Sequence, residues 1–89
     1  MRIIAHLPHP SLKITLMHHG RYLLKLEDAD VEVLYRFREE EGVASAEDAQ
    51  RVLDLGLLQE SEAHLRALSE ARRRYLPTAA DEEGFPEII

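Results

Sequence analysis

Histidine is the residue type in this sequence best suited to metal chemistry, because imidazole is a common metal ligand. Four of the five histidines lie near the start of the chain, at His6, His9, His18 and His19. If the segments that carry the two pairs form a hairpin, the pairs are separated by nearly a full strand, which is too far for one tetrahedral site. We therefore expect surface or turn histidines, with no metal site and no cofactor.

The patterns that serve other catalytic chemistry are missing from the sequence. It contains no cysteine, which excludes thiolate catalysis, disulfide bonds and cysteine-ligated zinc. It contains neither a glycine-rich phosphate loop nor a His-Glu-x-x-His motif. Carboxylates are abundant, but they stand in solvated runs such as residues 39–41, where burial does not tune a pKa. We therefore predict that the protein is not an enzyme.

Basic residues are concentrated at the start of the chain. The first 26 residues include four basic residues and no acidic one, whereas residues 27–89 carry a net charge of −10 and the whole chain −6. A basic surface of this kind would orient an anionic partner. We expect Lys13, Arg21 and Lys25 to contact a protein partner. The alternative is that these cations pair with the acidic residues of the chain itself.

Arg72, Arg73 and Arg74 form the densest basic cluster. Clustered arginines contact nucleic-acid phosphates, and nucleic-acid binding through these three residues is therefore the alternative function. A purely structural explanation also exists, because cations in the last turn of a helix oppose the negative end of its dipole.

The last residues change from acidic to apolar. We predict that residues 1–76 form a single domain and that residues 77–89 form an acidic and apolar tail, because the tail has no periodicity. Phe85, Ile88 and Ile89 could bind a sheet edge or groove as an extended peptide. The alternative is an end whose apolar residues fold back loosely on the domain.

Alternation of apolar and polar residues over the first forty positions is typical of strands. It predicts strands at residues 2–7, 12–18, 21–27 and 31–37, joined by turns rich in Pro, Gly and Asp. The first strand adjoins two prolines and the last also fits a helix at its end, so three or four strands are expected.

The alternation also assigns the faces of these strands. The even-numbered apolar residues from Leu12 to Leu26 should point inward beneath helices, with Lys13 and Lys25 pointing outward. In the first strand, Ile3 should share a face with Ala5 and Leu7. Leu23 and Leu34 break the pattern, because they add apolar side chains to the outer face.

Helical spacing begins at Ser45. Ser45 and Asp48 have the spacing of a capping box, in which a hydroxyl and an acid each bind a backbone amide of the first turn. Gly56 fits the end of this helix, where a left-handed residue closes the last turn. A second helix is predicted at residues 59–75, and Pro77 would stop it.

The sequence therefore predicts an α+β domain, with a three- to four-stranded antiparallel β-meander followed by two α-helices packed on one sheet face. A chain of 89 residues buries only a small core, and open sheet edges expose unpaired amides. A partner would therefore add stability. No apolar run approaches the roughly 18 residues of a membrane span, and the first residues are no secretory signal, so we expect a cytoplasmic protein.

The segments at residues 9–15 and 20–27 have the sequences HPSLKIT and GRYLLKLE. This strand pair resembles that of a group of small uncharacterised bacterial proteins, which share an L-K-I-T strand, a G-[KR]-Y-x-x-K-x-E strand and helical C-terminal parts. The resemblance covers residues 9–75. It implies a bacterial cytoplasmic protein, and because it carries no known activity it assigns no site.

Taken together, these features predict a non-enzymatic protein–protein interaction module or small accessory subunit of a larger bacterial assembly. We expect it to bind a protein partner or to form a homodimer.

Overall fold

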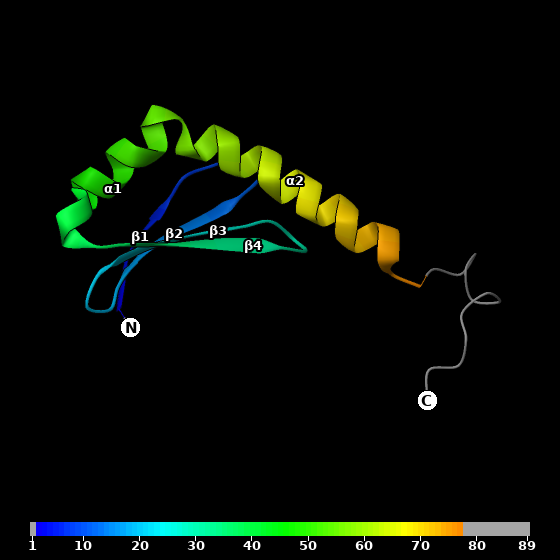
Figure 1. Cartoon of the computed structure of the whole chain (residues 1–89), viewed down its shortest axis with the longest axis horizontal. Helices are drawn as coiled ribbons and strands as arrows, with labels where there is room; N and C mark the ends of the chain where they lie inside the picture. The colour runs from blue at the N-terminus through cyan, green and yellow to red at the C-terminus, as the bar shows by residue number, and fades with distance from the viewer. Residues whose placement is uncertain (1, 78–89) are drawn as a thin grey trace.

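The structure of the chain is a computed structural model that describes residues 2–77. Four strands form one antiparallel sheet in the order β1-β2-β3-β4, and they span β1 (Arg2–Leu7), β2 (Lys13–His18), β3 (Tyr22–Glu27) and β4 (Glu32–Phe37). Consecutive strands are neighbours, as in a meander (Figure 1). The predicted α+β class and antiparallel meander are confirmed, with four strands.

The core lies between the sheet and the helices. Its centre consists of inward-pointing residues of the two middle strands: Ile14 and Leu16 of β2, and Leu24 and Leu26 of β3. Leu24 and Leu26 are completely buried. Burial of one such leucine contributes roughly 1.5–3 kcal/mol, so these strands supply much of the force that holds the sheet to the helices.

The first strand contains a bulge that the sequence pattern did not predict. Ile3 lies opposite Met17, whereas Ala5 lies opposite Leu16, so Ile4 is an extra residue in β1. An inserted residue reverses the alternation of faces along a strand. The prediction that Ile3 shares a face with Ala5 is therefore wrong: Ile3 lies on the outer face of the sheet with Met17.

The prediction of two separate helices is also wrong. After a short 3₁₀ turn, η1 (Glu39–Glu41), one helical run includes α1 (Ala46–Val52), a π-helical turn η2 (Leu53–Leu57) and the long helix α2 (Leu58–Tyr75). The expected stop at Gly56 is only a kink. Gly56 has a φ of 138°, which interrupts the helical backbone, but the Leu58 amide donates to the Leu53 carbonyl across the kink. This wider turn lets the helix resume without a loop.

The predicted helix start at Ser45 is confirmed, with one difference. The Ser45 hydroxyl accepts from the Asp48 amide at 3.1 Å. The Asp48 carboxylate, however, accepts from the Ala44 amide at 3.1 Å and not from that of Ser45. Together these hydrogen bonds fix the direction in which the chain enters α1.

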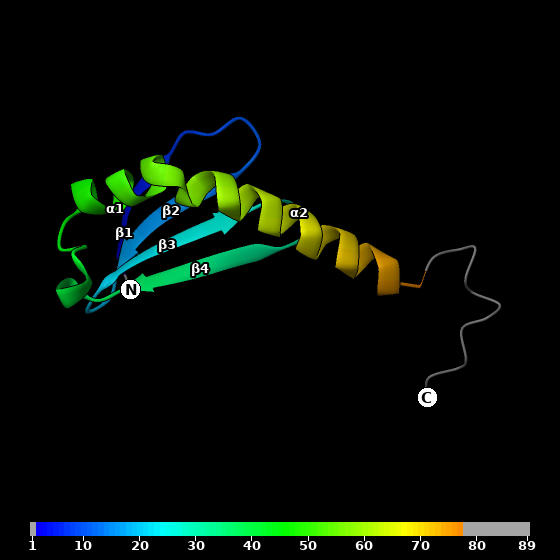
Figure 2. The same ribbon diagram turned by 45° about the horizontal axis from the view of Figure 1, so that its top comes forward.

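The helical run α1, η2 and α2 lies on one side of the sheet (Figures 1 and 2). A side-chain hydrogen bond connects the two layers, because the Tyr35 hydroxyl of β4 lies 2.7 Å from the buried Ser61 Oγ of α2. Within residues 2–77, no helix covers the opposite side of the sheet. No helix in this part of the chain is long and apolar enough to cross a membrane.

Candidate protein-interaction surface

The sheet side that faces away from the helices is called the open face here. Strand register brings side chains of all four strands into rows on it. One row runs from Ile3 through Met17 and Leu23 to Arg36. The neighbouring row includes Thr15, Lys25 and Leu34. The open face is thus built from residues far apart in the sequence.

Apolar residues form a strip across this face, which we define as Ile3, Met17, Leu23 and Leu34. Met17 and Leu23 are buried in the middle of the sheet, at 6% and 5% exposure. Ile3 and Leu34 on the two edge strands are exposed at 58% and 42%. A sheet face that meets only water normally alternates to polar residues. Ile3 and Leu34, at the two ends of the strip, are therefore the apolar surface that a partner could cover.

Sequence reasoning found half of the apolar strip. Leu23 and Leu34 broke the alternation and were noticed for that reason. Ile3 was missed because the bulge in β1 reverses its face. Met17 was missed because its place beside Ile3 and Leu23 follows from the strand register, which the pattern of one strand does not contain.

Lys13 and Lys25 point outward as predicted. Lys13 is exposed at the start of β2, directly opposite Glu27 of β3. Lys25 is half-buried in the middle of the open face, and its Nζ lies 3.6 Å from Glu27 Oε1. The alternative, that these cations pair with the chain's own acidic residues, therefore holds for Lys25. A pair at the protein surface, with both side chains partly exposed as here, contributes at most about 1 kcal/mol.

Arg21 lies away from the two lysines, in the turn between β2 and β3. There it lines a shallow hollow of about 470 Å³ together with Arg38, Glu39 and Glu40. The structure therefore brings Lys13 and Lys25 onto one face, and places Arg21 at the end of that face beside two acidic residues.

The three arginines of the predicted nucleic-acid site lie in the last turn of α2. Arg72 is paired with Asp30 at 3.8 Å, and the Arg74 guanidinium lies 5.8 Å from the centre of the Tyr75 ring. The last turn of α2 extends past the end of the sheet on its helical side (Figure 1), whereas Lys13 and Lys25 point to the open face. The arginines and the lysines therefore do not form one basic surface.

The histidines organise the sheet and one of its loops. His9 Nδ1 accepts from the amides of Ser11 and Leu12 at 3.1 and 3.0 Å, and its Nε2 lies 3.5 Å from Glu62 of α2. His6 Nδ1 lies 3.3 Å from the Thr15 hydroxyl. In residues 2–77, no three His, Asp or Glu side chains are grouped so that they could hold a metal ion.

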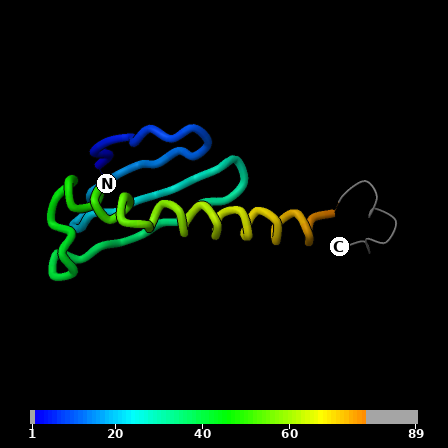
Figure 3. The backbone as a smooth tube through the Cα atoms, turned by 90° about the horizontal axis from the view of Figure 1, so that it is seen from above, coloured from blue at the N-terminus to red at the C-terminus, as the bar shows by residue number. Residues whose placement is uncertain are grey.

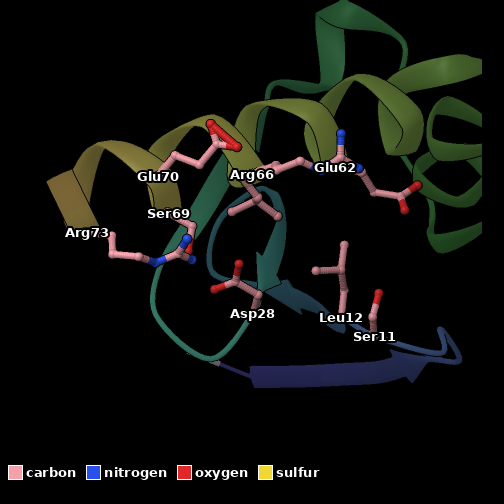
Figure 4. A pocket seen from close by; sticks show the side chains of 9 residues that line it. Ser11, Leu12, Asp28, Glu62, Arg66, Ser69, Glu70 and Arg73 are labelled. Carbon is pink, nitrogen blue, oxygen red and sulfur yellow. The ribbon is translucent and has the colours of Figure 1, made fainter.

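A cavity of about 330 Å³ lies between α2 and the sheet end that carries Leu12 and Asp28 (Figure 4). Two of its polar side chains are engaged: Glu62 lies beside His9, and Asp28 Oδ1 accepts from the amides of Asp30 and Val31. These two backbone hydrogen bonds lower the pKa of Asp28, and the bond from Val31 has the larger effect. A general acid working near neutral pH needs the opposite shift.

The remaining predicted site residues, Phe85, Ile88 and Ile89, lie outside the described residues. Comparison with models of known protein families finds no match, and comparisons with curated proteins and with solved structures find no significant match either. The functional argument therefore depends on the open face itself.

Proposed function

We propose that this chain is a non-enzymatic protein-interaction module that binds a partner protein with the open face of its sheet. The observation that carries the proposal is the apolar strip: Ile3 and Leu34 are exposed on a face that no helix of residues 2–77 covers. The opposite face of the same sheet is already occupied by α1 and α2, so the helices leave one side available.

The charges around the strip suit a protein contact. Lys13 and Arg36 are exposed on the same face as Glu27 and Glu32, so both signs are present. Mixed charges around an apolar centre orient a partner and exclude wrong ones, whereas a nucleic-acid surface needs cations gathered together. The separation of the arginine triplet from the lysines gives the nucleic-acid alternative less support.

The test compares two variants that each place a carboxylate on an exposed apolar position. Ile3→Glu alters the apolar strip, and Leu55→Glu is the matched control, because Leu55 is 80% exposed on the helical side. Tagged protein would be purified at natural abundance from the cells that produce it, and its complexes would be measured by native mass spectrometry.

The wild-type chain and Leu55→Glu should retain a bound protein, and Ile3→Glu should lose it while its circular dichroism spectrum stays native. A lone wild-type chain in these preparations would count against the proposal. So would a partner that Ile3→Glu retains and Leu55→Glu loses.

A further inference from the structure

The two edges of the sheet differ in how well they are protected from further strand pairing. The β1 edge contains the bulge at Ile4, a device that interrupts pairing. Strand β4 pairs with β3 in unbroken register from Glu32 to Phe37. Figure 3 shows β4 along the side of the sheet opposite β1. Its outer edge is therefore a regular strand able to accept another.

The hydrogen bonds identify which residues of β4 point to that edge. The Asp28 amide donates to the Val31 carbonyl at 3.0 Å, so the backbone of Val31 faces β3. Because backbone groups alternate along a strand, Val33, Tyr35 and Phe37 face β3 as well. The amides and carbonyls of Glu32, Leu34 and Arg36 must then face outward.

Both ends of this outward row are closed by local hydrogen bonds. Before it, the Asp30 amide donates to the Asp28 carboxylate at 2.7 Å. After it, the Arg38 amide donates to Glu41 Oε1 at 2.8 Å, and the Arg38 carbonyl accepts from the Glu41 amide. Within residues 2–77, what remains available is the row Glu32, Leu34 and Arg36. This row is symmetric in position about Leu34 and opposite in charge at its two ends.

We propose that β4 pairs antiparallel with β4 of a second copy of this chain, about a twofold axis at Leu34. Leu34 then lies opposite the partner's Leu34, and Glu32 lies opposite the partner's Arg36. Each opposed pair of outward residues exchanges two backbone hydrogen bonds, and the charged pairs add cross-strand attraction. The two sheets become one continuous sheet with the helices of both copies on the same side. This inference does not depend on the proposed function.

Other registers satisfy fewer groups. A shift by one residue turns inward side chains to the outer face, so only shifts by two are permitted. A shift by two places Leu34 opposite a charged residue, either Glu32 or Arg36. It also directs one end of the ladder to the backbone groups of Asp30 or Arg38, which are already engaged. The register centred on Leu34 is the one that satisfies both the charges and the amides.

The charge pattern gives a test in which the variants rescue one another. Glu32→Arg places an arginine opposite the partner's Arg36, and Arg36→Glu places a glutamate opposite the partner's Glu32. Each single variant should therefore dimerise roughly tenfold or more weakly than wild type in sedimentation equilibrium. The double variant Glu32→Arg/Arg36→Glu restores both opposed pairs and should recover dimerisation. An equimolar mixture of the two single variants should form the mixed dimer.

Oxidative cross-linking tests the register, because the chain has no cysteine of its own. Leu34→Cys should form a disulfide-linked dimer, since directly opposed residues have Cα atoms within disulfide range. Ile3→Cys is the control: this position is more exposed than Leu34 but lies on the other edge strand, so it should not form the disulfide-linked dimer.

Three results would overturn the pairing. The first is a wild-type protein that stays monomeric up to about 1 mM. The second is a dimer whose dissociation constant is the same in wild type and in both charge-reversal variants. The third is faster cross-linking of Ile3→Cys than of Leu34→Cys. A pure monomer that still binds a different protein through the open face would refute this pairing and leave the proposed function standing. A pure dimer that binds no other protein would support this pairing and count against the proposed function.

Discussion

The hydrogen bond between Tyr35 and Ser61 connects the helical layer to β4, and its removal has a calculable cost. Ser61 is completely buried, and its Oγ lies 2.7 Å from the Tyr35 hydroxyl. Tyr35→Phe leaves the serine hydroxyl without its partner, which costs about 1–3 kcal/mol of unfolding free energy. We expect a loss near the lower end of this range, because a helical serine can turn its hydroxyl to a carbonyl of its own helix.

The reverse change should cost less. Ser61→Ala removes the buried hydroxyl, and the phenol of the half-buried Tyr35 can still reach water, so a loss of about 1 kcal/mol is expected. The double variant has no orphaned hydroxyl in the core and should be no less stable than Tyr35→Phe. The two effects are therefore non-additive, with a coupling energy of about 1 kcal/mol.

Urea and thermal unfolding followed by circular dichroism would measure this cycle. In a domain of this size, 1 kcal/mol corresponds to a Tm shift of roughly 4–8 °C. Additive losses in the double variant, or a Tyr35→Phe variant as stable as wild type, would refute the reasoning. In that case this hydrogen bond would not hold the helices on one face of the sheet.

Three further predictions follow. Leu24→Ala should lower the unfolding free energy by about 2–5 kcal/mol, because the side chain is completely buried; a loss below about 1 kcal/mol would contradict the assigned core. Gly56→Ala should destabilise by about 1 kcal/mol or more, because φ is 138° there although space is open around the new methyl group; a gain in Tm would show that the kink is not required. Backbone hydrogen bonds lower the folded pKa of two carboxylates below 3.8: the largest contribution comes from the Val31 amide for Asp28 and from the Ala44 amide for Asp48. The stability that these two carboxylates add should therefore be fully present above the unfolded pKa and lost as pH falls through the lower folded pKa. In the double variant Asp28→Asn/Asp48→Asn, Tm should fall less steeply with acidification than in wild type. An unchanged dependence of Tm on pH would refute this.

Much of the fold could be predicted from local patterns. Alternation in β2 and β3 placed Ile14 and Leu24 in the core and Lys13 and Lys25 outside it, because a half-buried strand needs one apolar face. The N-cap at Ser45 was predictable because the cap is a contact within four residues.

The errors have a common cause in non-local geometry. The bulge at Ile4 depends on how β1 pairs with β2, and no alternation within β1 reveals it. Gly56 has the residue type of a helix end, but packing of Leu53 and Leu65 into the same core favours continuing the helix past it.

The candidate surface was predictable only in part for the same reason. The outward direction of Lys25 follows from its own strand, whereas its pairing with Glu27 and its place beside Leu34 follow from the sheet. The proposed matching of Glu32 with Arg36 across a twofold axis requires β4 to be an edge strand with Leu34 at its centre, which the pattern of β4 alone does not reveal.

The most direct test of the central claim, that the sheet and not the helices meets the partner, is site-specific photo-cross-linking in the cells that produce the protein. A photoreactive residue would be placed at position 3 on the open face or at position 55 on the helical side. Both positions are exposed, so the two proteins differ only in the face they probe. We predict a covalent adduct with another protein from position 3 and none from position 55. An adduct from position 55 alone would contradict the account.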